Sequence, residues 1–312
     1  MQHKEQKICI LGAGESGVGA ALLAQKQGYE VFVSDLGTIK PAFRTELEEN
    51  AIRFEEGQHT QAELVDAVLV IKSPGIPDTA PVIRKIKENA IPVISEIEFA
   101  ARFTDATKIC VTGSNGKTTT TLMTYHILKR SGLDVGLAGN VGKSFARQVA
   151  RHNHTHYVLE LSSFQLDGMY GFKADIAVIL NITPDHLDRY QNNFQRYIDS
   201  KFRITQNLTE KDHLVYCSDD KVLLEEIGKR IIHAGLFPFS VKQKVETGGY
   251  LEEELLHFRV NDDVFTIPVN ELPLEGLHNT YNTLAAGITG KIMHIRNEDL
   301  RESLRSFKAV EH

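Results

Sequence analysis

The chain has 312 residues, of which 42% are hydrophobic and 24% charged, with a formal net charge of −6. This length allows two domains, each with a core of its own, and the mild acidity gives no reason to expect nucleic acid or an anionic membrane as a partner. No apolar run reaches the roughly 18 residues of a membrane-spanning helix, and no signal-peptide core precedes the first apolar strand. We therefore expect a cytoplasmic protein of two domains, and a monomer.

A glycine-rich turn follows the first predicted strand. Residues 8–11 are apolar, residues 12–17 are Gly-Ala-Gly-Glu-Ser-Gly, and residues 18–27 have helical spacing. The second predicted strand, residues 30–34, ends at Asp35. This order is typical of a dinucleotide-binding fingerprint, in which the glycines admit a diphosphate and the acid binds a ribose diol. The pattern leaves two ligands open, a nicotinamide cofactor or another diphosphate-bearing nucleotide.

The rest of the first hundred residues predicts a parallel, doubly wound sheet. Three further strands are predicted from short apolar runs, at 52–54, 67–71 and 92–94. Residues 72–77, Lys-Ser-Pro-Gly-Ile-Pro, form a stiff turn after the fourth strand, in the region beyond strand ends where ligands bind. A turn that only connects two elements, without a ligand, explains these residues equally well. The polar stretch 102–107 marks a boundary, so we place the first domain at residues 1–104.

A second glycine-rich turn joins the apolar strand 108–112 to a predicted helix. The turn is Gly113-Ser114-Asn115-Gly116-Lys117-Thr118-Thr119. Glycines let backbone N–H groups point inward, and the helix N-terminus adds positive potential, so the turn can hold phosphates. Lys117 can reach the β- and γ-phosphates, and the Thr118 hydroxyl can bind Mg²⁺. Because Val111 stands where the common phosphate loop has glycine, this is the shorter G-x-x-G-K-T-T form of a nucleoside-triphosphate site.

Two later strands deliver polar side chains at their carboxyl ends. Glu160 ends one apolar run and could complete the coordination of the Mg²⁺ that Thr118 begins, because hard cations prefer oxygen ligands. His186 follows another strand and lies beside Asp185 and Asp188, a setting that favours a functional histidine over a structural one. We predict that these groups meet at one edge of the sheet.

The remaining chain predicts a mixed edge to this second sheet. Lys201 lies on a predicted helix, 194–205, and periodicity alone indicates a solvated lysine. Short alternating runs between residues 231 and 267 predict antiparallel hairpins. Asn279 and Asn282 share a face near the start of a long helix, where their amides could form hydrogen bonds with the edge of a purine base or cap the helix. These elements predict an α/β ATPase-like second domain at 105–306 with an antiparallel edge.

Together these motifs resemble the Mur ligases, the ATP-dependent amide-forming enzymes of bacterial cell-wall precursor synthesis. The resemblance is carried by the phosphate loop, Glu160-Leu161-Ser162-Ser163-Phe164-Gln165-Leu166, Asn181-Ile182-Thr183-Pro184-Asp185-His186-Leu187-Asp188-Arg189 and His278-Asn279-x-x-Asn282. The second of these motifs and residues 12–17 are most similar to the branch of the family that adds D-glutamate.

The resemblance implies the joining of D-glutamate to UDP-N-acetylmuramoyl-L-alanine through an acyl phosphate, with ATP and two Mg²⁺ ions. The first domain then binds the uridine nucleotide instead of NAD, and Lys201 is carbamylated. The implied catalytic residues are Lys117, His186 and Lys201. The implied substrate contacts are Ser16, Asp35, Gly75, Asn140, Ser162 and His186. The implied ATP contacts are Gly113, Ser114, Asn115, Gly116, Lys117, Thr118, Thr119, Asn279 and Asn282, and the implied metal ligands are Thr118, Glu160, His186 and Lys201.

Residues 307–312 resemble the start of the family's hinge to a C-terminal domain, so we expect a fragment that binds substrate without turnover. Other Mur ligases and folyl-polyglutamate synthases are alternatives within the resemblance. A NAD-dependent dehydrogenase, suggested by residues 12–17 and Asp35, leaves the second glycine-rich turn unexplained. A phosphate-loop switch protein is disfavoured by Val111 and by the pattern of Glu160 and His186.

Overall fold

The computed structural model describes residues 6–308, so the last four residues of the expected hinge, 309–312, lie outside the described residues. The chain forms two compact units that interleave along the sequence. The first comprises Met1–Asp105, Ala138–His154 and Ser163–Phe172, and the second comprises Ala106–Leu137, Thr155–Ser162 and Lys173–His312. The predicted domain limits, 1–104 and 105–306, stay a prediction.

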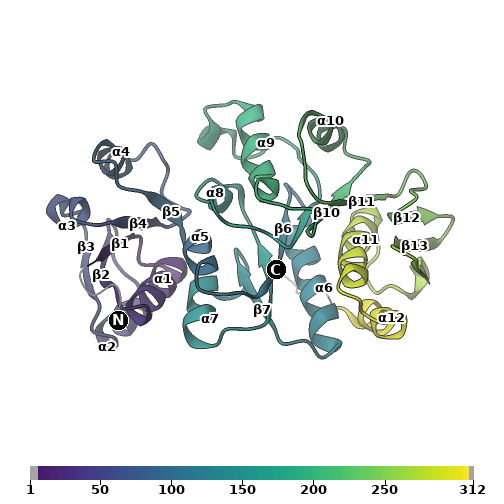
Figure 1. The fold of residues 1–312 in the computed structure, drawn as a ribbon, viewed down its shortest axis with the longest axis horizontal. Helices are drawn as coiled ribbons and strands as arrows, with labels where there is room; N and C mark the ends of the chain where they lie inside the picture. The colour runs from purple at the N-terminus through teal and green to yellow at the C-terminus, as the bar shows by residue number, and fades with distance from the viewer. Residues whose placement is uncertain (1–5, 309–312) are drawn as a thin grey trace. The chain divides into compact units, whose positions relative to one another are not determined.

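The first unit is built on a parallel five-stranded sheet with the order β3-β2-β1-β4-β5 (Figure 1). Its strands are β1 (Lys7–Leu11), β2 (Glu30–Asp35), β3 (Arg53–Glu56), β4 (Leu69–Lys72) and β5 (Val93–Ser95). Its helices are α1 (Glu15–Lys26), α2 (Pro41–Glu49), α3 (Gln61–Val65), α4 (Pro81–Glu88), α5 (Glu96–Ala101), α7 (Phe145–Arg151) and α8 (Ser163–Leu166). β1 is buried along its whole length, as expected of a central parallel strand covered on both faces. The predicted doubly wound sheet is confirmed.

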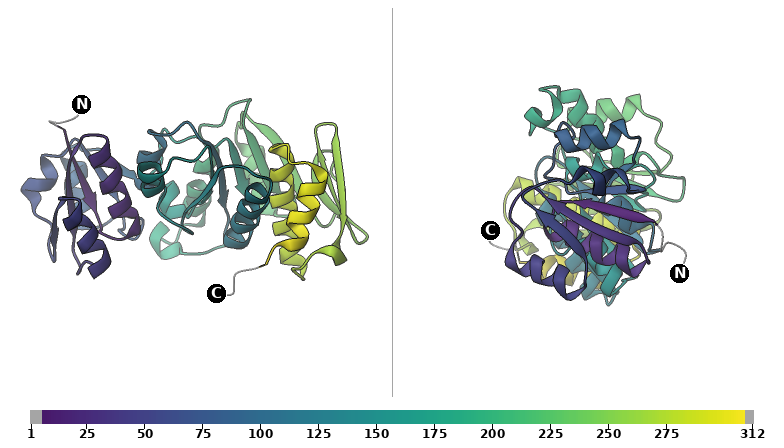
Figure 2. Two further views of the ribbon diagram at one scale, coloured as in Figure 1. Left: turned by 90° about the horizontal axis from the view of Figure 1, so that it is seen from below. Right: turned by 90° about the vertical axis from the view of Figure 1, so that its left-hand side faces the viewer.

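The second unit contains most of a nine-stranded mixed sheet with the order β14-β13-β12-β11-β10-β9-β6-β8-β7. Its strands are β6 (Thr107–Thr112), β7 (Val135–Gly139), β8 (His156–Glu160), β9 (Ile176–Ile179), β10 (His213–Cys217), β11 (Gly235–Ser240), β12 (Gly248–Glu252), β13 (Leu255–Val260) and β14 (Asp263–Pro268). The α-helices are α6 (Lys117–Arg130), α9 (Phe194–Phe202), α10 (Lys221–Lys229), α11 (Leu277–Ile292) and α12 (Asn297–Ser306), and short 3₁₀ turns lie at Leu187–Tyr190, Arg203–Thr205 and Val269–Glu271. Helices α6, α11 and α12 pack against one another (Figures 1 and 2). Within residues 6–308, no helix combines the length and the apolar character that a bilayer crossing requires.

The prediction of antiparallel hairpins across 231–267 is partly wrong. β11 pairs in parallel with β10, and β12 pairs in parallel with β11. Antiparallel pairing begins between β12 and β13 and continues to β14. The physical reason for the parallel pairing of β10 with β11 is that α10 lies between them in the sequence, so these three elements form a crossover unit. Helix α11 packs against β10, β11, β12 and β13. The alternation of buried and exposed residues within a strand is the same for parallel and antiparallel pairing, so the sequence pattern does not distinguish them.

A buried carboxyl group joins α5 to the start of α7 in the first unit. Glu96 is 3% exposed, and its Oε1 accepts hydrogen bonds from the Ser144 hydroxyl at 2.8 Å and from the backbone N–H of Ala146. Burial raises the pKa of Glu96 from 4.5 to about 7, and the nearby Glu15 carboxylate raises it too, while these hydrogen bonds and Arg147 act in the opposite direction. Folding therefore favours the protonated form of Glu96.

We expect this group to make the first unit less stable as pH rises. Between pH 4.5 and about 7 the folded state holds a proton that the unfolded chain has released, so the free energy of unfolding falls across this window. Glu96→Gln keeps an acceptor oxygen and cannot ionise. The free energy of unfolding of the variant minus that of the parent should therefore increase as pH rises from 5 to 8. Urea unfolding of both proteins across this range measures the difference, and parallel pH profiles would contradict the assignment.

Candidate functional site

The turn between β6 and α6 has the backbone geometry of a phosphate loop. Gly113 and Gly116 have φ values of +152° and +83°, which side chains rarely adopt, and Gly116 is the residue before the first turn of α6. The apolar strand β6 ends in the buried Thr112, and α6 begins at Lys117. The N-terminus of a 14-residue helix is thus presented to the turn, where it favours an anion.

Side chains fix the turn to the segment that follows β9. The Ser114 hydroxyl donates to the Thr183 carbonyl at 2.9 Å and accepts from the Thr183 N–H at 3.0 Å. The Asn115 N–H donates to Asn181 Oδ1 at 2.8 Å, and the Asn181 amide donates back to the Asn115 carbonyl at 3.0 Å. These hydrogen bonds therefore fix the turn to the segment that follows β9.

Lys117 is directed toward this turn. Its Nζ donates to the carbonyls of Gly113 and Ser114, both at 2.9 Å. Burial lowers the pKa of Lys117, and the carboxylates of Glu160 and Asp185 oppose that shift. The structure thus brings an ammonium group and two carboxylates to the carboxyl end of the sheet, which is the composition that a triphosphate with a divalent cation requires.

Lys201 is buried, and the prediction of a solvated lysine is wrong. It is 2% exposed, its Nζ donates to the Gly113 carbonyl at 2.8 Å, and it lies 4.6 Å from the centre of the Tyr197 ring. Burial and, to a smaller extent, the charge of Lys117 lower the pKa of Lys201 to about 7, although Asp185 acts in the opposite direction. One signal in the sequence indicates this position, because Lys201 follows Tyr197 by four residues and shares its inward helix face.

The other predicted metal ligands differ in exposure. Glu160, at the end of β8, is 1% exposed and pairs with Val111 of β6, two residues before the phosphate loop. Thr118 is half-buried in the first turn of α6. His186 is exposed, has a left-handed φ of +49°, and its Nε2 lies 3.5 Å from Asp185 Oδ2. Residues other than glycine seldom adopt this conformation, although histidine does so more often than most, and here it turns the chain into the short helical turn at Leu187.

A cavity of about 510 Å³ lies beside the phosphate loop and the start of α11. It is lined by Asn115, Gly116, Thr119, Leu180, Asn181, Cys217, Asp219, Asp220, His278, Tyr281 and Asn282. Sequence analysis did not select Asp219 and Tyr281, which are joined by a 2.8 Å hydrogen bond from the tyrosine hydroxyl. The available signal was the position of Asp219 at the carboxyl end of β10.

The alternative that Asn279 and Asn282 cap α11 is wrong. The helix begins after Gly276 without a side-chain cap. Asn282 is 5% exposed and uses its amide inside the protein, accepting from the Thr120 hydroxyl at 3.2 Å and donating to Asn279 Oδ1 at 3.4 Å. Asn282 therefore joins α11 to α6 at the rim of the cavity.

The first unit has its own cavity, of about 630 Å³, at the carboxyl ends of β1, β2 and β4. Asp35 and Gly75 both line it. The Asp35 carboxylate accepts from the N–H groups of Ala13 at 2.6 Å and Gly37 at 2.8 Å, so it also holds the glycine-rich turn. Lining residues that sequence analysis missed come from the α3 and α4 region, for example His59, Gln61 and Lys85.

The remaining predicted substrate contacts lie elsewhere. Ser16 lines a separate cavity of about 20 Å³ in the first unit, next to Pro74. Asn140 is exposed in the first unit, and Ser162 is half-buried in the second. Their proposed meeting around one substrate stays a prediction.

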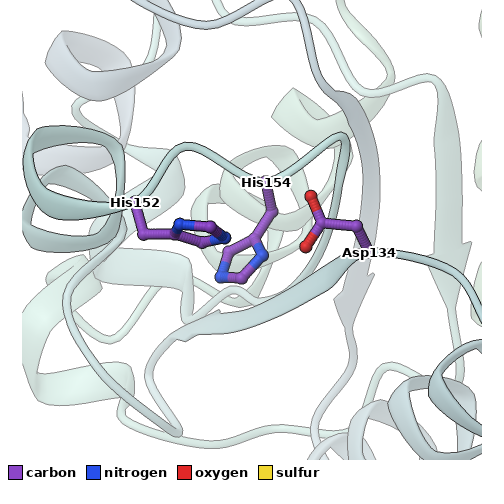
Figure 3. Close-up of side chains that lie close together, drawn as sticks. All are labelled: Asp134, His152 and His154. Carbon is purple, nitrogen blue, oxygen red and sulfur yellow. The ribbon is translucent and has the colours of Figure 1, made fainter.

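Figure 3 shows three side chains that sequence analysis did not single out. His152 and His154 follow α7 in the first unit, with ring centroids 4.4 Å apart in an edge-to-face arrangement. Asp134 belongs to the second unit, where its carboxylate accepts from the Thr155 N–H at 3.0 Å. We assign no function to them.

Two family models match the chain. The Mur ligase middle domain covers residues 111–290, and the MurD N-terminal domain covers residues 7–82. The chain belongs to the Mur ligase family. It is 52% identical to a UDP-N-acetylmuramoylalanine–D-glutamate ligase of Bacteroides fragilis over 307 residues, which are 98% of this chain and 69% of that relative. It is 51% identical to the enzyme of the same name from Porphyromonas gingivalis over an alignment of 315 positions, which covers 100% of this chain and 70% of that relative.

Solved structures of Mur ligases share the fold. A UDP-N-acetylmuramate:L-alanyl-gamma-D-glutamyl-meso-diaminopimelate ligase from Neisseria meningitides aligns with a TM-score of 0.69 and 21% identity, covering 98% of this chain and 99% of that one. UDP-N-acetylmuramate-alanine ligase from Thermotoga maritima aligns with a TM-score of 0.60 and 22% identity, covering 98% of this chain and 69% of that one. The predicted family and the predicted α/β fold are thus confirmed.

Proposed function

We propose that this chain carries the substrate and ATP sites of a ligase that adds D-glutamate to UDP-N-acetylmuramoyl-L-alanine in peptidoglycan precursor synthesis. The observation that carries the proposal is the 52% identity to ligases of that name, which extends over 98% of the chain and so includes both units. The phosphate loop, with Lys117 directed at its carbonyls, supplies an ATP site consistent with that activity.

The reaction needs two group transfers. The substrate carboxylate attacks the γ-phosphorus of ATP, a P–O bond forms, and ADP leaves. The amine of D-glutamate then attacks the resulting acyl phosphate, an amide bond forms, and phosphate and a proton leave. Negative charge gathers on phosphoryl oxygens in the first transfer, so the Lys117 ammonium and the N–H groups of the first turn of α6 stabilise it electrostatically.

The donor set fits a divalent cation at the phosphate loop. Glu160 offers a carboxylate and Thr118 a hydroxyl, both oxygen ligands of the kind that Mg²⁺ prefers. His186 and a carbamylated Lys201 would hold a second ion, as the family resemblance implies. A bound Mg²⁺ neutralises phosphate charge and polarises oxygen. Lys201 is suited to carbamylation because burial lowers the pKa of its ammonium group and so favours the neutral amine. Attack of that amine on CO₂ forms an N–C bond and releases one proton.

The first unit is proposed to bind the uridine nucleotide. Neither Gly14 nor Gly75 has a positive φ, and a Cβ built on either would meet nothing within 4 Å, so the fold itself does not require glycine there. A ligand that approaches the backbone closely would explain glycine at these two positions of the cavity region. We further propose that the protein is cytoplasmic and monomeric.

Calorimetric titration of the purified chain with UDP-N-acetylmuramoyl-L-alanine tests the proposal, with NADH as the control ligand. Saturable binding of the uridine compound, and none of NADH, is the expected result. Binding of NADH alone would overturn the proposal in favour of a dehydrogenase. A parallel titration with ADP and Mg²⁺ tests the second unit independently.

Asp35→Ala is expected to weaken binding of the uridine compound at least about tenfold, because a hydrogen bond to a charged group contributes roughly 1.5–3 kcal/mol. The same change releases the N–H groups of Ala13 and Gly37. Affinity for ADP, measured on the same sample, should stay at the level of the parent protein. An unchanged affinity for the uridine compound would exclude Asp35 from that site.

A further inference from the structure

The turn after β4 forms one wall of the large cavity in the first unit. The Ser73 N–H donates to the Leu11 carbonyl at 2.9 Å, and the Ile76 N–H donates back to the Ser73 carbonyl at 3.1 Å. Pro74 and Gly75 are therefore the two central residues of a β-turn, where proline presets the first position. Gly75, Ile76, Pro77 and Ala80 line the cavity of about 630 Å³, so the shape of this turn sets the shape of that wall.

One buried ammonium group holds the turn. Lys72, the last residue of β4, is 8% exposed, and its Nζ donates to the Ile76 carbonyl at 2.7 Å. The same Nζ lies 3.2 Å from Asp78 Oδ1, and Lys87 Nζ donates to Asp78 Oδ2 at 3.1 Å. Burial tends to raise the pKa of Asp78, but the two ammonium groups hold it below its ordinary value. Lysine is almost never this buried unless it is paired, so the contacts account for its position.

Lys72 contacts the turn without lining the large cavity. It lines instead the separate space of about 20 Å³ on the other side of Pro74, which has room for about one water molecule. A ligand in the large cavity therefore meets the turn and not the ammonium group. Lys87 differs, because its side chain is 52% exposed and it joins this group through Asp78 at the outer end.

We propose that Lys72 is a positioning residue for the nucleotide substrate, fixing the Ser73–Pro77 turn so that its backbone is ready to receive the ligand. The inference rests on the proposed uridine-nucleotide site of the first unit. Loss of the ammonium frees the Ile76 carbonyl and leaves Asp78 with Lys87 as its only ammonium partner in this group, and the turn then has to be ordered when the ligand binds. Binding should weaken for that reason although no contact with the ligand has been removed.

The test measures the affinity of Lys72→Met for UDP-N-acetylmuramoyl-L-alanine by calorimetry. Methionine keeps an unbranched side chain of similar length and removes the charge. We expect affinity for the uridine compound to fall about tenfold, with ADP affinity unchanged. Lys87→Met is the matched control, and it should bind within about twofold of the parent because it leaves the Ile76 contact intact.

A purely structural role for Lys72 would lower the thermal midpoint and leave the affinity of the folded protein unchanged, and that result would overturn the proposal. Asp78→Asn provides a second variant at a side chain that is 57% exposed, where folding is not at risk, and it should weaken binding severalfold. If both variants bind like the parent, Lys72 has no positioning role. If the parent protein itself does not bind the uridine compound, the proposed function and this inference both fail, whereas parent-like binding by both variants contradicts this inference alone.

Discussion

Replacing Gly17 with alanine should destabilise the first unit by roughly 3 kcal/mol or more, at the upper end of the range for forcing an extra group into a packed interior. Gly17 lies in the first turns of α1, and a Cβ there would overlap the Gly12 carbonyl oxygen and lie 2.9 Å from the Gly12 carbonyl carbon. The obstacle is backbone and cannot rotate away. The helix would have to move off the sheet, which would also disturb the glycine-rich turn.

Gly14→Ala is the matched control for this prediction. It is three residues earlier in the same motif, but its Cβ would meet nothing within 4 Å and its φ of −85° suits any residue. We expect it to change stability by less than about 1 kcal/mol, the usual size of a change at a helix N-cap. Hydrogen exchange at the amides of β1 and β4 reports the first unit separately, and equal exchange in the two variants would contradict the packing argument.

The contrast between these glycines shows how far sequence reasoning extends. Both belong to the strand–turn–helix pattern that predicts the first sheet and its nucleotide site, because that signal is local in sequence. Which glycine serves packing and which leaves room for a ligand depends on what lies opposite each one. For Gly17 that is the Gly12 carbonyl, and for Gly14 it is open space.

The second unit shows the same division. The phosphate loop and Glu160 at a strand end follow from local patterns of apolar strand and polar turn. The burial of Lys201 follows from them only in part, because its spacing from Tyr197 places it on the inward helix face but the carbonyl that it meets belongs to Gly113, 88 residues earlier in the chain. Likewise, the direction of β11 is set by the α10 crossover, and the contact of Tyr281 with Asp219 joins residues 62 apart. Long-range packing decides these features, and a single sequence gives it little local signature.

Gly116→Ala is expected to damage the ATP site more than any substitution of a side chain at its rim. A Cβ at this position would overlap Asn282 Oδ1 and lie 3.3 Å from its amide carbon, and φ is +83°. The left-handed conformation alone costs an alanine roughly 1–2 kcal/mol. The overlap adds to that, because Asn282 is 5% exposed and committed to Thr120, so it has little room to retreat. We expect a loss of stability of roughly 3 kcal/mol and a weakening of ADP binding beyond about tenfold.

Gly132→Ala separates the two causes. Gly132 has nearly the same φ, +85°, follows the same helix α6, and a Cβ there would meet nothing within 4 Å. It should therefore show the conformational penalty alone and leave ADP affinity unchanged. The Asn282→Ala change removes the side chain that obstructs a Cβ at position 116. When Gly116→Ala is introduced into the Asn282→Ala protein, the loss of stability should therefore be smaller than in the parent and close to the loss that Gly132→Ala causes. Denaturant unfolding of these four variants and the parent protein measures this coupling, and strictly additive effects would mean that Gly116 is required for its backbone conformation and not for its contact with α11.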